Sequence, residues 1–372
     1  MKILIVSIWT IENKSIGGTE RYIIHLASAL KKRGHEVDVL MLSGEEGIIN
    51  GVRCHSAPFI CKKINEYILK NYINNVSSLS LDKLADLFSY FEVEDYDVIH
   101  VNSPLCFNLF PNKNKIITLH NYPLEFDIDW GSRHYPEMCN IVKSSDNKSI
   151  IFNSPSTYYA DMFTKDFGVN VEVIPHCYDE QHLFTNLDKE TIRNKLGISE
   201  KFTILFPSRL ELEQKRPDLG LQAIALIKQY LPDFQIVFVG VDDQYCENIK
   251  YLKEIAAKEQ LDCKFLKSVV MSEAYKISDL VILPSKWETF GYCAVESLFL
   301  RIKTVLTTIP SFKAIAKDNG YAFLCGHDVN DMAAAILEAY RADVSNIRID
   351  DWAKKYSEDA WVDSYLSLYK KF

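Results

Sequence analysis

The sequence has no long hydrophobic run, no paired-cysteine motif and no excess of positive charge, and each absence excludes a class of protein. No stretch reaches the ~18 uninterrupted apolar residues that a membrane-spanning helix needs. The opening apolar run, residues 2–7, is too short for a signal peptide, so we expect none. The nine cysteines are scattered without a C-x-x-C pair. This argues against a zinc ribbon or a disulfide framework and favours a reduced, cytoplasmic protein.

The charge balance argues against a nucleic-acid partner. Fifty acidic residues outnumber 42 basic ones and give a net charge of −8, whereas proteins dedicated to nucleic acids are usually basic. The remaining composition, 48% hydrophobic and 25% charged, is that of an ordinary globular protein. A length of 372 residues then corresponds to about two domains.

The first half of the chain opens with one βαβ unit. Residues 2–7 form a continuous apolar run, typical of a strand buried in a parallel sheet. From Glu20 the apolar residues recur at three- and four-residue spacing up to Gly34, which predicts a helix, and residues 37–42 return to a strand pattern. Further segments of this half have their own patterns: strands at 98–101, 116–120 and 150–153, and a mainly helical stretch at 61–92.

A second α/β series begins at residue 203. Its predicted strands, with helices between them, are 203–208, 235–239, 264–266, 280–284, 304–307 and 321–324. We therefore expect an α/β fold of two doubly wound, Rossmann-like domains, residues 1–175 and 176–357, facing a central cleft. Ligands of such sheets bind beyond the carboxyl ends of the strands.

Gly17 and Gly18 lie between the first strand and its helix. Without side chains, their backbone can approach an anion closely, although a plain turn is an equal interpretation. The pair fits neither the dinucleotide fingerprint nor a phosphate-binding P-loop.

Two cations follow the strand that opens the second half. Arg209 and Lys215 lie six residues apart on a strand-to-helix loop, before Pro217 at the expected helix start. A diphosphate is the anion that suits this arrangement, with charge-assisted bonds of about 1.5–3 kcal/mol each. A solvated basic loop is the alternative.

The segment 284–296 carries the strongest signal. Glu288 lies on a loop after a strand, and Glu296 lies eight positions later inside the next helix. The amides of Phe290 and Gly291 open that helix and can face a phosphate. Glu296 can accept both hydroxyls of a ribose, and Glu288 can accept hydroxyls of another sugar. Two unrelated surface glutamates are the alternative.

Glu288 to Glu296 resembles the E-x7-E motif of retaining GT-B glycosyltransferases, particularly glycosyltransferase family 4. Further resemblances run along nearly the whole chain: Gly17–Glu20, Arg33–Val37, Val173–His176 with Asp179, the Arg209 and Lys215 pair, and the closing segment Trp352–Tyr369. In the family the last helix returns to the first domain, so the resemblance implies that residues 358–372 join residues 1–175.

The resemblance implies transfer of a sugar from a nucleotide-diphosphate sugar to a hydroxyl acceptor, with retention of configuration and without metal or cofactor. It places Arg209 and Lys215 on the diphosphate, Glu288 and His120 on the donor sugar, and Glu296 on the ribose. The other donor-binding residues that it implies are Gly17, Gly18, Thr289, Phe290, Gly291 and Tyr292. Considered alone, His120 is more typical of a structural histidine.

The resemblance also suggests the acceptor: bacterial relatives commonly build surface polysaccharide or glycolipid, so we expect a glycan or lipid-linked acceptor. The stretch containing Lys62, Lys63 and Tyr67 would then be either a surface helix or a peripheral contact with an anionic membrane face. Asp127 and Asp129 spell the metal-binding D-x-D of a different glycosyltransferase fold, but an acceptor-side loop fits them better. Asp242 and Asp243 are interpreted as a turn and helix start.

Several positions depart from the family pattern on the donor side. Arg301 and Lys303 stand where Gly and Pro are usual, Pro310 stands at a common Gly-Gly pair, and Thr289 replaces a frequent glycine. These departures keep one alternative open, a GT-B binding or scaffolding subunit that does not turn over. A second alternative is another GT-B-like enzyme, such as a nucleotide-sugar epimerase.

Overall fold

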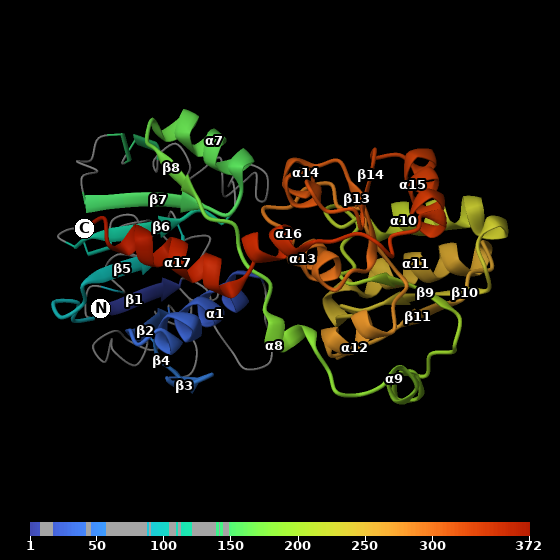
Figure 1. Ribbon diagram of the computed structural model, residues 1–372, viewed down its shortest axis with the longest axis horizontal. Helices are drawn as coiled ribbons and strands as arrows, with labels where there is room; N and C mark the ends of the chain where they lie inside the picture. Colours follow the sequence, from blue (N-terminus) through green and yellow to red (C-terminus); the bar gives the residue numbers. More distant parts are fainter. Residues whose placement is uncertain are drawn as a thin grey trace. The chain divides into compact units, whose positions relative to one another are not determined.

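The computed structural model describes residues 1–7, 18–41, 46–56, 88, 91–103, 109–110, 113–120, 139–140, 142–143 and 149–372. The chain divides into two compact units (Figure 1). Unit 1 comprises Met1–His176 together with Glu358–Phe372, and unit 2 comprises Cys177–Ser357. The predicted helical stretch 61–92 and the D-x-D segment at Asp127 lie outside the described residues, apart from residue 88 and residues 91–92.

Unit 1 is built on an eight-stranded sheet in the order β3-β4-β2-β1-β5-β6-β7-β8. The strands are β1 (Lys2–Ser7), β2 (Glu36–Met41), β3 (Gly47–Ile49), β4 (Val52–Ser56), β5 (Val98–Val101), β6 (Lys115–Thr118), β7 (Ile150–Ser154) and β8 (Val171–Val173). All neighbours pair in parallel except β3 with β4. Central β1 buries Ile3 to Val6 completely, because helices and neighbouring strands leave no face of it to solvent.

The helices of unit 1 follow the apolar spacing of the sequence. Helix α1 (Gly18–Lys32) buries Tyr22, Ile23, Leu26 and Leu30 among others, and the chain leaves it through Gly34 at φ +84°. Only glycine adopts that left-handed backbone without strain, so the predicted helix stop is confirmed. Helix α7 (Thr157–Phe167) ends in the same way at Gly168, φ +69°.

The last helix, α17 (Glu358–Tyr369), belongs to unit 1 and is held by a buried polar ring. Five residues close the ring through hydrogen bonds: Tyr22–Tyr365 at 2.7 Å, Tyr365–Asn153 at 3.0 Å, Asn153–Thr118 at 2.8 Å, Thr118–His100 at 2.6 Å and His100–Tyr22 at 3.4 Å. Tyr369 is attached to this ring by its hydrogen bond with His100 at 2.8 Å. Two tyrosines of α17 thus bond to side chains of α1, β5 and β7, and Thr118 of β6 links the last two strands. Buried polar groups that are all satisfied specify one docking geometry.

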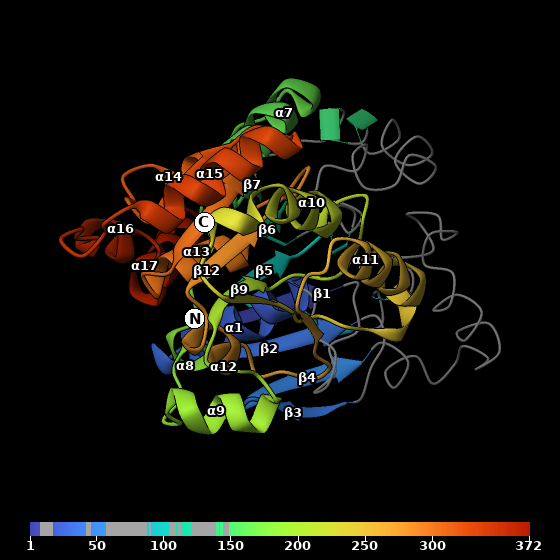
Figure 2. The ribbon, with the colours of Figure 1, turned by 90° about the vertical axis from the view of Figure 1, so that its right-hand side faces the viewer.

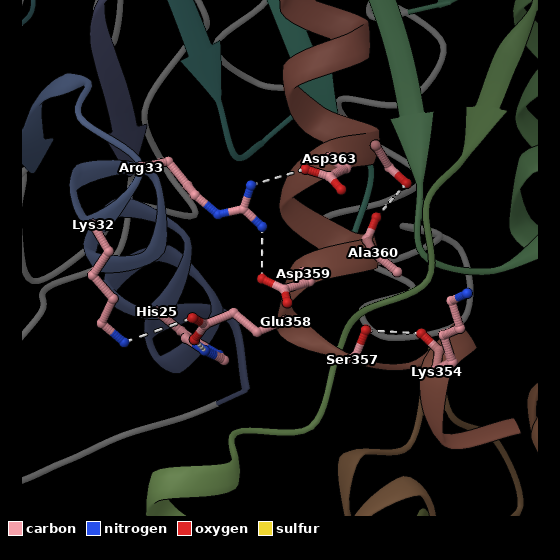
Figure 3. Close-up of polar contacts among 10 residues, drawn as sticks. His25, Lys32, Arg33, Lys354, Ser357, Glu358, Asp359, Ala360 and Asp363 are labelled. Carbon is pink, nitrogen blue, oxygen red and sulfur yellow. Dashed lines mark hydrogen bonds and ion pairs between the residues drawn. The ribbon is translucent and has the colours of Figure 1, made fainter. Parts of the chain in front are cut away.

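Ion pairs reinforce this docking at the surface. Figure 3 shows the acids of α17 turned toward basic side chains of α1, His25 and Lys32, and toward Arg33, which follows α1. Glu358 lies 2.7 Å from His25 Nε2 and 3.6 Å from Lys32 Nζ, and Arg33 pairs with Asp359 at 2.6 Å and with Asp363 at 3.1 Å. Glu358 and Asp359 lie in the first turn of α17, where the helix dipole also favours negative charge.

Unit 2 is built on a six-stranded parallel sheet in the order β11-β10-β9-β12-β13-β14. The strands are β9 (Phe202–Phe206), β10 (Phe234–Phe238), β11 (Cys263–Phe265), β12 (Leu280–Leu283), β13 (Lys303–Thr307) and β14 (Ala322–Cys325). The helices are α8 (Glu180–Leu183), α9 (Lys189–Leu196), α10 (Pro217–Ile227), α11 (Cys246–Lys258), α12 (Met271–Lys276), α13 (Tyr292–Phe299), α14 (Pro310–Ala316), α15 (Val329–Arg341) and α16 (Asp350–Lys355), with short 3₁₀ turns at Lys228–Tyr230 and Asp243–Tyr245. Helices α10 and α11 lie side by side (Figures 1 and 2).

The order of strands in unit 2 creates a switch point. From β9 the chain builds β10 and β11 on one side and then crosses back to build β12, β13 and β14 on the other. The loops that leave the carboxyl ends of β9 and β12 therefore depart in opposite directions. In open parallel sheets this is where a ligand crevice forms.

The donor-side departures seen in the sequence have local structural roles. Arg301 follows α13 in the left-handed region, at φ +58°, a conformation that costs a side-chain-bearing residue about 1–2 kcal/mol and suits the usual glycine. Lys303 donates from Nζ to the carbonyl of Tyr340 at 3.2 Å. Pro310 opens α14 in its first turn, where a proline loses no hydrogen bond.

The predicted α/β architecture is confirmed, and the predicted strands lie within two residues of the observed ones. The sequence analysis missed β3, β4 and β8. Asp242 does start a turn, since its side chain accepts from the amide of Gln244 at 3.0 Å. None of the helices in the described part of the chain combines the length and apolarity that a membrane crossing requires.

The ion pairs of α17 make a prediction about pH. The hydrogen bond from His25 lowers the pKa of the Glu358 carboxyl below its usual 4.5. The stability that this carboxylate contributes is therefore complete above pH 4.5 and is lost as pH falls through the lowered pKa. Glu358→Gln should reduce the free energy of unfolding at neutral pH by at most about 1 kcal/mol, because the pair is partly exposed.

Urea denaturation at neutral pH and at a pH well below 4.5 measures this effect. The difference from the wild type should vanish at the acidic pH. Asp351→Asn, at an exposed acid of α16, is the control and should show no such pH dependence. A difference that persists at acidic pH would rule out the ion pair as its source.

Candidate functional site

Two loops of unit 2 meet at the switch point between β9 and β12. One loop, residues 207–216, leaves β9 and enters α10, and the other, residues 284–291, leaves β12 and enters α13. Gln214 joins them through two hydrogen bonds. Its side-chain Nε2 donates to the main-chain carbonyl of Trp287 at 3.1 Å, and its own main-chain carbonyl accepts from the backbone amide of Lys286 at 2.7 Å. The loops therefore form one structural element at the carboxyl edge of the sheet.

Lys215 and Glu288 are in direct contact in this element. Lys215 Nζ donates to Glu288 Oε1 at 2.5 Å, and Ser285 Oγ donates to the same oxygen at 2.9 Å. Only 11% of the Lys215 side chain and 14% of the Glu288 side chain are exposed. Because removing one partner of such a pair leaves the other charge buried without compensation, each residue holds the other in place.

Arg209 is the more accessible cation of the element. Its side chain is 58% exposed and is anchored by Gln214 Oε1, 3.4 Å from Nη2, and by Glu211 at 3.9 Å. Further positive charge lies at the same edge. After burial, the nearby Arg216 and Lys286 are the groups that lower the pKa of His327. Acidic partners lie beside these cations as well, since Arg216 pairs with Asp218 at 3.4 Å and Arg209 with Glu211. An anionic ligand would therefore bind individual cations of this edge, and Arg209 is the most accessible of the paired ones.

Helix α13 begins at this edge in an unusual backbone conformation. Gly291 has φ +102°, and a Cβ at this position would lie 2.6 Å from the ring of Phe312. A glycine is therefore required for two reasons, backbone conformation and space. Phe290 is a buried core residue whose ring meets Tyr292 edge-on at 5.4 Å.

Glu296 lies further along α13 and is enclosed. The residue is 1% exposed, and Oε2 accepts a hydrogen bond from the hydroxyl of Tyr275, on α12, at 2.8 Å. Cys293 lies between the two glutamates. Burial, followed by the charge of Glu296, raises the pKa of its thiol to about 12, and Lys215 opposes that shift. Glu288 raises the same pKa further, so the thiol stays neutral at physiological pH and is influenced by Glu296, Lys215 and Glu288 together.

Of the remaining predicted residues, Gly18 and His120 belong to unit 1, and Thr289 and Tyr292 belong to unit 2. Thr289 lies on the second loop, Tyr292 is the first residue of α13, and both are half-buried. Gly18 is the first residue of α1, and Gly17 lies outside the described residues. His120 is 8% exposed, two residues beyond β6. Burial lowers the pKa of its imidazole to about 3, so the ring is neutral at physiological pH.

Four residues of the site were missed by sequence reasoning: Gln214, Ser285, Tyr275 and Cys293. Ser285 and Gln214 adjoin predicted residues on the same loops, so their proximity in sequence was a usable signal. Tyr275 comes from a separate helix and had no such signal. The described residues contain no group of three or more His, Cys, Asp or Glu side chains arranged to hold a metal ion.

Comparison with known families matches the two halves of the chain separately. The family model described as glycosyl transferases group 1 matches residues 188–356, and the model described as Glycosyltransferase Family 4 matches residues 16–182. The first match contains both loops of the switch point. Together the two matches leave only the ends of the chain and a short connecting segment uncovered.

Relatives and solved structures agree with this assignment. Mannosylfructose-phosphate synthase of Agrobacterium fabrum is 24% identical over 87% of this chain and 79% of its own. An uncharacterised protein of the cps region of Klebsiella pneumoniae is 25% identical over 80% and 85%, respectively. The crystal structure of HepE from Anabaena, in complex with UDP and glucose, superimposes with a TM-score of 0.75 at 16% identity over the whole of both chains. With two parallel α/β units and matches to both halves, this chain belongs to the GT-B glycosyltransferases, in the family described by the group 1 and Family 4 models.

Proposed function

We propose that the protein is a retaining glycosyltransferase that moves a sugar from a nucleotide-diphosphate sugar to a hydroxyl acceptor. The observation that carries the proposal is the joined pair of loops at the switch point of unit 2, where Arg209, Lys215 and Glu288 gather. Residues 176–357 would bind the donor, and residues 1–175 with 358–372 would serve the acceptor. HepE was crystallised with UDP and with UDP-glucose, which supports a donor of this class.

The diphosphate would bind Arg209 and Lys215. Arg209 is exposed enough to meet a ligand without displacing a buried partner. The amides of Phe290 and Gly291 lie at the start of α13, where the helix dipole favours a phosphate, and Gly17 and Gly18 would assist from unit 1. Lys215 would bind the diphosphate while it remains paired with Glu288, so this one cation would interact with both the diphosphate and the Glu288 carboxylate.

Glutamates would hold the two sugars of the donor. Glu288 is fixed by Lys215 and Ser285 and would accept hydroxyls of the transferred sugar, with Thr289 and Tyr292 beside it. Glu296 would accept the ribose hydroxyls, oriented by the hydroxyl of Tyr275. His120 would contact the transferred sugar, in the role that the family resemblance implies.

The reaction then follows from charge. The bond from the anomeric carbon to the diphosphate oxygen breaks, positive charge grows on the sugar, and negative charge grows on the diphosphate. Arg209 and Lys215, fixed in advance, stabilise that developing charge more strongly than the ground state. The acceptor oxygen bonds to the anomeric carbon on the face that the diphosphate leaves, and its proton passes to the departing phosphate. These side chains supply the positive charge that a metal would otherwise provide, so we propose a metal-independent reaction without a cofactor.

The acceptor would be a glycan or lipid-linked hydroxyl, in surface polysaccharide or glycolipid synthesis. The Klebsiella relative from a cps region supports this assignment. Such an acceptor would place the protein in the cytoplasm, with peripheral contact at the inner membrane face.

The proposed activity is tested with the purified protein and a panel of nucleotide-diphosphate sugars. One donor should release its nucleoside diphosphate slowly in water and faster with an acceptor, and NMR of the product should show the anomeric configuration of the donor. Tight donor binding without release across the panel would instead indicate a binding subunit. Conversion of a donor to its epimer without acceptor would indicate an epimerase.

The diphosphate assignment predicts a selective loss of affinity. Arg209→Ala should weaken nucleoside-diphosphate binding about 10- to 100-fold, the equivalent of one charge-assisted hydrogen bond, and leave nucleoside binding unchanged. Arg341→Ala, in the last turn of α15, is the matched control and should change neither. Calorimetry with both ligands measures the effect, and equal losses for the two would remove the diphosphate role.

Lys215→Ala should show the same selectivity together with a loss of stability, because it leaves the Glu288 carboxylate buried without its cation. Glu288→Gln separates the two effects. It should also lose stability, because it leaves the Lys215 cation buried without its carboxylate, but it keeps Lys215 and should retain nucleoside-diphosphate binding.

The close packing of Gly240 against the backbone of Ser208 and Arg209 leads to a further prediction. Gly240, which follows β10 at φ +74°, lies so close that a Cβ would be 2.9 Å from the carbonyl oxygen of Ser208 and 3.2 Å from Cα of Arg209. Gly240→Ala should therefore shift the loop and weaken nucleoside-diphosphate binding about tenfold or more.

Gly197→Ala is the matched control, since Gly197 has φ +66° with nothing within 4 Å of an added Cβ. Both substitutions should cost about 1–2 kcal/mol of backbone strain, but only the first should change affinity. Equal affinities for the two variants would show that the loop does not depend on Gly240.

A further inference from the structure

Asn102 and His120 lie together at the carboxyl edge of the sheet in unit 1. Asn102 directly follows β5, and His120 lies two residues beyond the adjacent strand β6. The strand order of unit 1 has its own switch point between β1 and β5, so this edge is where a parallel sheet binds ligands. Asn102 is 2% exposed. A buried amide at such an edge has its orientation determined by its partners.

The orientation of the Asn102 amide follows from Val6. The carbonyl oxygen of Val6, in β1, accepts from the backbone amide of Asn102 at 3.0 Å and from its side-chain Nδ2 at 3.3 Å. A carbonyl oxygen only accepts, so the side-chain nitrogen must face Val6 and Oδ1 must face the other way. The Val6 carbonyl of β1 thus determines which way the amide of Asn102 points at the end of β5.

The same rule then determines the proton on His120. Asn102 Oδ1 lies 3.0 Å from His120 Nε2, and a carbonyl oxygen at that distance requires a proton on Nε2. The Tyr22 ring meets the imidazole edge-on at 4.7 Å between centroids, and the His176 ring lies 5.6 Å away. Burial lowers the pKa of His120, so the ring carries a single proton. Nδ1 is left with its lone pair.

We infer that Asn102 is a positioning residue, which fixes His120 as the Nε2–H tautomer so that Nδ1 accepts a hydrogen bond from a hydroxyl of the transferred sugar. This inference rests on the proposed function, which places His120 against that sugar. A neutral ring nitrogen that can only accept hydrogen bonds distinguishes ligand groups that donate from groups that only accept. It favours a hydroxyl, which donates, and disfavours a carboxylate, which would place a second acceptor against it. The donor sugar is therefore a neutral sugar rather than a uronic acid at the position that meets His120.

The tautomer is tested without any substrate. The ¹⁵N NMR spectrum of the histidine-labelled full chain distinguishes a protonated from an unprotonated ring nitrogen, and His120→Asn identifies the His120 signals by their loss. We expect a protonated Nε2 and an unprotonated Nδ1 in the wild type. A proton on Nδ1 would overturn the inference whether or not any variant folds.

The positioning role is tested with Asn102→Leu, which removes the acceptor at similar volume. The His120 signals should change to a mixture of tautomers, and kcat/KM with the donor identified above should fall about tenfold. The variant should also lose much of the preference for that donor over its uronic-acid counterpart. Tyr96→Phe, which removes a hydrogen bond to Asp38 at the opposite edge of the sheet, is the control for lost stability and should leave tautomer and preference unchanged.

The outcomes separate this inference from the proposed function. If no donor is turned over, the proposed function fails, and with it the sugar contact. If turnover is normal in Asn102→Leu while the tautomer is lost, the enzyme stands and the role of Asn102 is refuted.

Discussion

The contact between Lys215 and Glu288 is the interaction on which the site of unit 2 depends. It joins the loop after β9 to the loop after β12, and Ser285 and Gln214 extend the same connection. Both side chains are largely withdrawn from water, so neither can leave without exposing the other to an uncompensated charge. The pair therefore fixes two groups of opposite charge before a ligand arrives. Such prior ordering is what electrostatic stabilisation of a transition state requires, because no reorganisation is then needed during the reaction.

Much of the fold could be predicted from the sequence because parallel strands are buried on both faces. Residues 2–7, 98–101 and 280–283 are short apolar runs for that reason, and all three are strands in the structure. The strands that were missed have a different character. β4 alternates buried and exposed residues beside a three-residue antiparallel partner, and β8 has only three residues. Such segments acquire their conformation from the neighbouring strand, which a local pattern does not contain.

The site could be predicted in its parts but not in its connections. Arg209, Lys215, Glu288 and Glu296 follow from their places after strands and at helix starts. The sequence analysis assigned Lys215 and Glu288 to different groups of a ligand, and their direct pairing depends on a strand order that places β9 beside β12. Tyr275 illustrates the same limit, since it reaches Glu296 from a helix 21 residues away in sequence. For Asn102 and His120, two adjacent strand ends create a contact across 18 residues.

The polar ring that holds α17 has a consequence for biosynthesis. Tyr365 and Tyr369 complete the interior of unit 1, yet they are separated from the rest of that unit by the whole of unit 2. A ribosome must therefore translate unit 2 before the last helix can dock, so the first unit to emerge is the last to be finished. Until then His100 and Asn153 lack their tyrosine partners, and the face that α17 covers is open to water or to a chaperone.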